Sequence, residues 1–280
     1  KVWWDKEMKQ RLIVAGVGIP VLLLILLAAP VWATAAMCAL LSAVGCYELM
    51  HAVGKDEWKL LCLMPLFAAW MCTSIGLGEE WTPEPGLYMA AACFVAVVYT
   101  FAMAVVTHGR ERSLSFRTAM AGLFAMSAIA AGFACLVILR DISPAVVLTP
   151  FIGAFMSDTG AFFAGRAFGK RKLCPAVSPN KTVAGCIGGF VGSIAGMAVF
   201  HLVVKTWFQL DLGWGVVILM GVIGSLFGQL GDLSFSVIKR EFGIKDYGAI
   251  FPGHGGVLDR FDSVLFVAPA YLLFMLLYFA

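Results

Sequence analysis

Long apolar segments recur along the whole chain, and each is long enough to cross a lipid bilayer as a helix. A transmembrane helix needs about 20 mostly apolar residues. Nine segments meet this requirement: 11–32, 33–53, 60–77, 86–107, 117–139, 145–168, 183–204, 213–230 and 258–280. The chain is 61% hydrophobic and 13% charged, which agrees with a lipid environment. We therefore predict an all-α fold, a polytopic integral membrane protein with about nine transmembrane helices.

The positive charges favour one side of this predicted topology. If the nine segments alternate in direction, 18 of the 20 Lys and Arg residues lie on one side and only Arg140 and Lys205 on the other. The positive side holds the N-terminus and the segments 51–59, 108–117, 166–182 and 231–262. Loops that face the cytoplasm are enriched in Lys and Arg. We predict a multi-pass protein of the cell (cytoplasmic) membrane whose functional site faces the cytoplasm.

The predicted spans divide the chain into two parts. Residues 1–143 contain spans 1–5, and residues 144–280 contain spans 6–9 together with the polar loops of interest. Glycines recur every four residues at Gly188, Gly192 and Gly196, a spacing that lets helix backbones approach closely. We expect these glycines to pack within the helix bundle, and a homodimer face is the alternative. The eight cysteines show no zinc-ligand spacing, so we interpret them as packing residues.

Carboxylates gather on the predicted cytoplasmic side. Asp158 stands among aromatic residues late in span six, where a charge is costly unless it is paired or faces water. Asp232 and Ser236 are four residues apart, so they share a face if span eight continues as a helix. Asp259 and Asp262, three apart at the start of span nine, are also expected on one face. Taken alone, the Asp232 pair also fits a solvated helix end, but Mg²⁺ sites often use one or two such carboxylates.

A glycine-rich turn, Pro252-Gly-His-Gly-Gly256, precedes the last two carboxylates. Such residues permit close backbone approach, so their N–H groups can line an anion pocket. A second turn, Ser178-Pro-Asn-Lys-Thr182, precedes span seven. Together these features predict a phosphate-binding and divalent-metal site at the membrane surface.

The segment from Ser236 to Asp262 resembles the signature of the phosphatidate cytidylyltransferase (CDP-diacylglycerol synthase) family. That signature is Ser, two residues, Lys-Arg, four residues, Lys-Asp, a short gap, Pro-x-His-Gly-Gly, two residues and Asp-Arg-x-Asp, and every fixed position is present here. Ser-Asp-Thr-Gly at 157–160 and Ser-Pro-Asn-Lys-Thr at 178–182 also resemble family motifs. The resemblance covers spans six to nine, whereas spans one to five match only in being hydrophobic.

The resemblance implies a Mg²⁺-dependent nucleotidyltransferase of phospholipid biosynthesis that converts CTP and phosphatidate to CDP-diacylglycerol and pyrophosphate. It implies that Asp232 and Asp259 hold a metal centre, with Ser236 close by. Whether a second cation binds is left open by the sequence. The expected catalytic residues are Asp232, Asp259, Lys239 and Ser236. The expected substrate-binding residues are Asp158, Ser178, Asn180, Lys181, Thr182, Arg240, Lys245, Asp246, His254, Gly255, Gly256, Arg260 and Asp262. The expected partners are CTP, phosphatidate and the lipid bilayer, with a possible homodimer and no nucleic acid.

Two positions depart from the family pattern, and two other functions remain open. Ala184 stands where the family usually has Glu or Gln, and Phe235 where Glu is common. A CTP-dependent kinase of lipid alcohols would use the same nucleotide with another acceptor. A membrane transporter of lipids or ions belongs to a different class and predicts essential polar residues at mid-membrane and on both faces. Here the polar motifs gather on one face.

Overall fold

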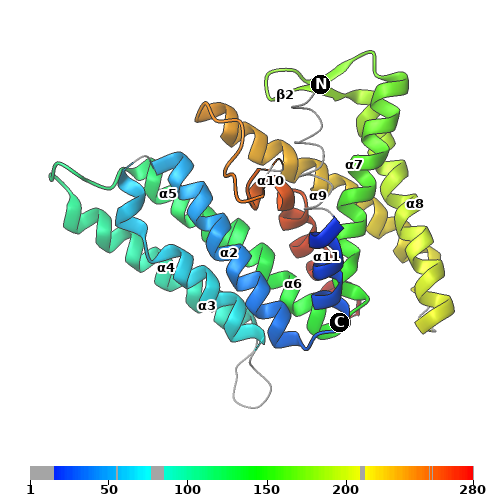
Figure 1. The fold of residues 1–280 in the computed structure, drawn as a ribbon, viewed down its shortest axis with the longest axis horizontal. Helices are drawn as coiled ribbons and strands as arrows, with labels where there is room; N and C mark the ends of the chain where they lie inside the picture. The colour runs from blue at the N-terminus through cyan, green and yellow to red at the C-terminus, as the bar shows by residue number, and fades with distance from the viewer. Residues whose placement is uncertain are drawn as a thin grey trace. The chain divides into compact units, whose positions relative to one another are not determined.

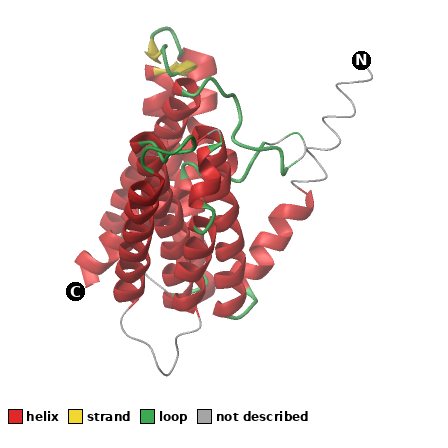
Figure 2. Ribbon diagram, turned by 90° about the vertical axis from the view of Figure 1, so that its left-hand side faces the viewer, coloured by secondary structure: helices red, strands yellow, loops and turns green. Residues whose placement is uncertain are grey.

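The computed structural model describes residues 16–54, 56–76, 85–208, 212–251, 253 and 255–279. The regular structure of these residues is helical apart from one hairpin of two short strands, as Figure 2 shows. The all-α prediction is therefore confirmed for the described part of the chain.

Seven described helical segments are long and apolar enough to cross a membrane. They are α2 (Val31–Gly54), η1 (Glu57–Leu61) with α3 (Met64–Gly76), α4 (Pro85–Thr107), α5 (Phe116–Phe124) with η2 (Ala125–Ala130) and α6 (Ala131–Ile142), η3 (Val146–Leu148) with α7 (Thr149–Phe168), α8 (Val183–Phe208), and α9 (Trp214–Glu241) (Figure 1). Shorter apolar helices, Gly16–Leu27 and α11 (Val264–Phe279), fall in the first and ninth predicted spans. The chain is thus a polytopic membrane protein.

Many large apolar side chains on these helices face outward. Val105 in α4 is 76% exposed, and Val191 in α8 is 64% exposed. Soluble proteins rarely expose so much contiguous apolar surface. This outward-facing apolar surface agrees with helices that span a membrane.

Two predicted helix boundaries were wrong. Span eight was predicted to end at residue 230, but α9 continues to Glu241 and stops just before Gly243, whose φ of 67° suits a helix end. The predicted span 258–280 is broken: α10 (Leu258–Phe261) is followed by a turn, and α11 begins at Val264. At this turn Asp262 Oδ1 accepts the Ser263 N–H at 2.7 Å, a local bond that competes with helix continuation.

The chain divides into two compact units. The first comprises Lys1–Pro144 and Phe242–Phe261, and the second comprises Ala145–Glu241 and Asp262–Ala280. In the first unit, α2 packs on α3 and α6, and the short α10 also contacts α2. In the second unit, α7, α8, α9 and α11 pack together. The assignment of function to residues 144–280 as a domain stays a prediction.

Glycines set the spacing of α7 and α8 in the second unit. A Cβ added to Gly192 in α8 would lie 2.9 Å from the Cα of Gly160 in α7, so the two backbones are nearly in contact. Gly188 and Gly196 in α8 also face α7. Packing of the glycine stripe within the bundle is therefore confirmed, and the homodimer stays a prediction.

A buried tyrosine joins α11 to the same bundle. Tyr271 is fully buried, and its hydroxyl donates to the Met220 carbonyl in α9 at 2.6 Å. Gly153 in α7 and Gly224 in α9 leave the space that this hydroxyl occupies, because a Cβ at either position would collide with it. Small residues thus allow a polar contact between close helices.

We predict that Gly192→Ala destabilises the second unit. The added methyl group meets backbone atoms of α7 that cannot rotate away, and overpacking of this kind costs about 1–3 kcal/mol. Thermal unfolding in detergent should show a lower midpoint for Gly192→Ala. Gly215→Ala in α9 is the matched control, since no atom lies within 4 Å of its added Cβ. Equal midpoints for the two variants would contradict the close packing of α7 and α8.

Candidate functional site

A short hairpin presents the Ser178–Thr182 motif. Strand β1 (Lys172–Cys174) pairs antiparallel with β2 (Ser178–Thr182), with Lys172 opposite Thr182 and Cys174 opposite Ser178. We predicted a turn at Ser178–Thr182, whereas the structure has a strand there. Thr182 Oγ1 accepts the Gly185 N–H at 3.0 Å and so caps the start of α8. The hairpin and helix together fix where Asn180 and Lys181 lie.

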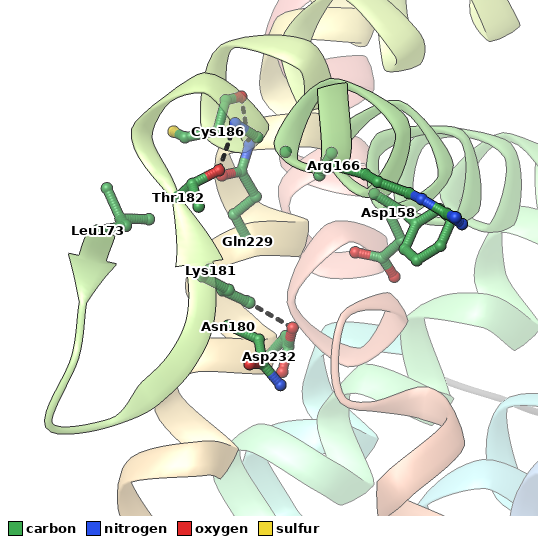
Figure 3. A pocket seen from close by; sticks show the side chains of 13 residues that line it. Asp158, Arg166, Leu173, Asn180, Lys181, Thr182, Cys186, Gln229 and Asp232 are labelled. Atoms are coloured by element: carbon green, nitrogen blue, oxygen red, sulfur yellow. Dashed lines mark hydrogen bonds and ion pairs between the residues drawn. The ribbon is translucent and has the colours of Figure 1, made fainter. Parts of the chain in front are cut away.

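A cavity of about 610 Å³ lies within the second unit, between this hairpin and the neighbouring helices (Figure 3). Its size is that of a small-molecule site. Helix α7, the hairpin, α8 and α9 line it with Asp158, Ala161, Phe162, Gly165, Arg166, Leu173, Asn180, Lys181, Thr182, Gly185, Cys186, Gln229 and Asp232. The cavity therefore combines apolar walls with charges of both signs.

An ion pair between Lys181 and Asp232 joins β2 to α9 at this cavity. The Lys181 Nζ lies 2.5 Å from Asp232 Oδ2, and the two side chains are 26% and 27% exposed (Figure 3). Ser236 donates its hydroxyl to Asp232 Oδ1 at 3.3 Å, which confirms that α9 brings Asp232 and Ser236 to one face. Both oxygens of the Asp232 carboxylate thus have a partner. Partial exclusion of water strengthens the attraction between the charges.

A buried polar chain supports the wall of the cavity. Gln229 donates to the Cys186 carbonyl at 3.2 Å and to the Ser225 hydroxyl at 2.8 Å. Ser225 in turn bonds Ser157 through a hydroxyl contact of 2.9 Å. Sequence reasoning did not select Gln229 or Arg166 as site residues. An amide late in the apolar span eight was the available signal for Gln229, because polar groups in such helices need partners.

The second unit brings five predicted site residues to the cavity: Asp158, Asn180, Lys181, Thr182 and Asp232. The other predicted residues of this unit lie outside its lining: Ser178 in β2, Ser236, Lys239 and Arg240 in α9, and Asp262 before α11. Arg240 donates through Nε to the Val177 carbonyl at 3.2 Å, which holds the hairpin close to α9. These placements confirm that residues of α7, the hairpin and α9 meet at one cavity. Their roles in substrate binding and catalysis stay predictions.

Asp262 precedes α11 and therefore stands outside the apolar helix. Loss of hydration, with the negative charge of Asp232 as a smaller cause, raises the pKa of Asp262 to about 7. Asp259 lies in α10, whereas Asp262 lies in the turn that follows it. The shared face of the two carboxylates stays a prediction, but the continuous helix on which it was based was wrong. The break at Asp262 and Ser263 is the reason.

The remaining predicted residues belong to the first unit. Asp259 Oδ2 accepts the backbone N–H groups of Tyr247 and Gly256, each at 2.9 Å. The loop before α10 holds Lys245, Asp246, Gly255 and Gly256, and α10 itself holds Arg260. Gly255 has a φ of 86°, as expected for a glycine-rich turn. His254 and Pro252 lie outside the described residues.

The Mg²⁺ site stays a prediction for the described part of the chain. No three His, Cys, Asp or Glu side chains gather there as a complete metal site. Mg²⁺ does not require one, because it commonly takes one or two carboxylates and completes its shell with water and substrate phosphates. The oxygens of Asp232, with Ser236 beside it, suit such a hard cation. Asp232 and Asp259 fall in different units, so their pairing at one metal stays a prediction.

One departure from the family pattern has a structural explanation. Phe235 is fully buried in the second unit and packs edge-on against Phe266, with ring centroids 6.2 Å apart. An aromatic side chain therefore fills a dry position. Ala184 lies in the first turn of α8, and nothing in the structure explains the absence of a polar side chain there.

Comparisons with known proteins place this geometry in context. Residues 9–278 match the model of the cytidylyltransferase family. A phosphatidate cytidylyltransferase of Staphylococcus haemolyticus is 36% identical over 234 residues, which cover 82% of this chain and 85% of the relative. One of Staphylococcus aureus is 42% identical over 184 residues, or 65% of each chain. One of Staphylococcus saprophyticus is 39% identical over 181 residues, again 65% of each.

We predict that Thr182→Val weakens the start of α8. Valine keeps the shape of threonine but loses the oxygen that accepts the Gly185 N–H. Loss of such a cap costs about 1 kcal/mol. Thermal unfolding should therefore show a lower midpoint for Thr182→Val, whereas Thr182→Ser keeps the oxygen and should remain close to wild type. If Thr182→Ser falls as far as Thr182→Val, the hydroxyl is not the stabilising group.

Proposed function

Because the chain belongs to the cytidylyltransferase family, we propose that it is a phosphatidate cytidylyltransferase (CDP-diacylglycerol synthase). The observation that carries the proposal is the similarity to enzymes of that name over most of the chain, together with the charged cavity of the second unit. The complete signature from Ser236 to Asp262 agrees with it. A transporter does not account for this match.

The reaction joins the phosphate of phosphatidate to the α-phosphate of CTP and releases pyrophosphate. An oxygen of the phosphatidate phosphate attacks the α-phosphorus of CTP and forms a new P–O bond. The bond from the α-phosphorus to the bridging oxygen breaks, and pyrophosphate leaves with the electron pair. Phosphoryl chemistry of this kind depends mainly on positioning and on neutralising negative charge. The protein must therefore supply cations and hydrogen-bond donors rather than a covalent nucleophile.

The cavity residues suit the handling of nucleotide phosphates. Lys181 is held in place by Asp232, so its ammonium group is already oriented towards the cavity before a ligand arrives. Arg166 adds a second positive group to the lining. We assign phosphate neutralisation to Lys181, with Lys239, Arg240 and Arg260 as further cations. Asp158, Asn180 and Thr182 are assigned to nucleotide binding.

Asp232 and Asp259 are the proposed ligands of Mg²⁺, and Ser236 positions the Asp232 carboxylate. Mg²⁺ bound with the substrate would neutralise phosphate oxygens and orient the pyrophosphate leaving group. A second cation is part of the same proposal.

The substrates also suggest the setting. The acyl tails of phosphatidate remain in the bilayer, whereas CTP arrives from water. The asymmetry of Lys and Arg supports a site that faces the cytoplasm of a cell whose plasma membrane holds the enzyme. A homodimer is included in the proposal, although the glycine stripe of α8 is already covered by α7.

We predict that the purified protein releases pyrophosphate only when CTP and phosphatidate are both present. Asp232→Asn and Asp259→Asn should each lower the rate by about 100-fold or more, because each removes a negative charge that the proposed cation requires. Asp56→Asn is the matched control, since the Asp56 side chain is 81% exposed and pairs with Lys59 at 3.4 Å on the surface of the first unit. Pyrophosphate and lipid product should be measured together.

Other products would identify the competing function. A CTP-dependent kinase of lipid alcohols would release CDP with an alcohol acceptor and no pyrophosphate with phosphatidate. Near-normal turnover by a folded Asp259→Asn variant would show that Asp259 is not a metal ligand. The proposed reaction itself would not be contradicted by that result.

We predict that the activity needs a divalent cation. Chelation with EDTA should abolish pyrophosphate release, and added Mg²⁺ should restore it, because the proposed ion would neutralise phosphate oxygens and orient the leaving group. Ca²⁺ is the control ion, since its longer bonds and higher coordination number fit the same ligands poorly. Full activity in EDTA would overturn the metal proposal.

A further inference from the structure

A buried carboxylate in the first unit contacts the loop that leads into α10, the short helix that carries Asp259. Glu48 lies in the last two turns of α2 and is only 3% exposed. Its Oε1 accepts the Val257 N–H and its Oε2 accepts the Leu258 N–H, each at 3.0 Å. These two amides come directly before Asp259. The carboxylate therefore holds the end of the loop and the first residue of α10 against α2.

The loop is shaped to admit this carboxylate. A Cβ on Gly248 or on Gly256 would collide with the Glu48 carboxyl group, so both positions need glycine for the approach. The loop also closes on itself, since the Phe251 N–H donates to the Gly255 carbonyl at 3.0 Å. The glycines of this segment thus serve a contact with α2 as well as the backbone turn.

Asp259 completes the arrangement from the other side. Its Oδ2 accepts the Tyr247 and Gly256 N–H groups, while Glu48 accepts the next two amides along the chain, those of Val257 and Leu258. Three consecutive amides, from Gly256 to Leu258, are therefore bound by two carboxylates. A shift of this segment would move Asp259, whose own backbone follows directly.

We propose that Glu48 is a positioning residue of the enzyme: it fixes the segment 242–257 before α10, here called the signature loop, so that Asp259 is held in its working geometry. This inference rests on the proposed function for its catalytic consequence. Two adjacent N–H groups need two acceptor oxygens, and only a carboxylate offers both without a competing donor. A charged group in an apolar helix is costly, which is why such residues usually serve function.

The test compares Glu48→Gln and Glu48→Ala with a matched control, Glu57→Gln. Glu57 belongs to the same unit and accepts the Ser115 N–H at 2.9 Å, but it contacts the start of α5 and not the signature loop. Each variant should be purified in detergent and its thermal midpoint recorded. Hydrogen–deuterium exchange of peptides covering 244–261 reports on the loop, and pyrophosphate release against Mg²⁺ concentration reports on the site.

The expected result has two parts. Glu48→Ala should speed exchange in the loop peptides, lower kcat by about 10- to 100-fold and raise the Mg²⁺ concentration for half-maximal rate, as for residues that orient metal ligands. Glu48→Gln keeps one acceptor and should fall between Glu48→Ala and wild type. Glu57→Gln should leave loop exchange and Mg²⁺ dependence unchanged even if its thermal midpoint falls.

Two outcomes would overturn the proposal. Unchanged loop exchange in Glu48→Ala would show that the carboxylate does not hold the loop. Faster exchange with unchanged kcat and Mg²⁺ dependence would show that Glu48 is structural only. If wild type itself releases no pyrophosphate, the proposed function fails, and the exchange measurement still decides whether Glu48 positions the loop.

Discussion

The cost of keeping charge among apolar helices governs the arrangement of both units. A carboxylate that leaves water needs partners, and three carboxylates show how these are supplied. Asp232 is paired with Lys181 and Ser236, and Glu48 and Asp259 each accept two backbone N–H groups. The partner of Asp232 in β2 and the partners of Glu48 are distant in sequence, and those of Asp259 lie in the loop before α10. Ser236 lies one turn further along the same helix as Asp232. The need for partners therefore links segments that apolar packing alone would leave free to slide.

Small residues make this arrangement possible in the second unit. Gly160 and Gly192 let α7 and α8 approach until their backbones almost touch, and Gly224 admits the Tyr271 hydroxyl beside α9. Lipid is as apolar as leucine, so close van der Waals contact and internal hydrogen bonds replace the hydrophobic effect as the attraction between such helices. The hairpin before α8 forms one wall of the cavity and carries Lys181 to Asp232 in α9.

The sequence predicted the parts of the fold that depend on local pattern. Apolar length located the helices, and the spacing of Asp232 and Ser236 correctly predicted a shared face. The break at Asp262 was missed because hydropathy does not report a side chain that bonds the next backbone N–H. The hairpin was missed because strands this short have no periodicity to detect. Glu48 was missed because its partners, the amides of Val257 and Leu258, are far away in sequence and carry no residue-type signal.

The Lys181–Asp232 ion pair bears on how such a site would work. Phosphates bring several negative charges, and a lysine that already points into a partly dry cavity needs little reorganisation to meet them. The same lysine also screens Asp232, so a carboxylate can remain close to the path of an anionic substrate. If the proposed Mg²⁺ binds, Asp232 and Ser236 would help to hold it, and Lys181 would be available to the phosphates. Each charge would then keep a partner of opposite sign, which offsets the cost of removing it from water.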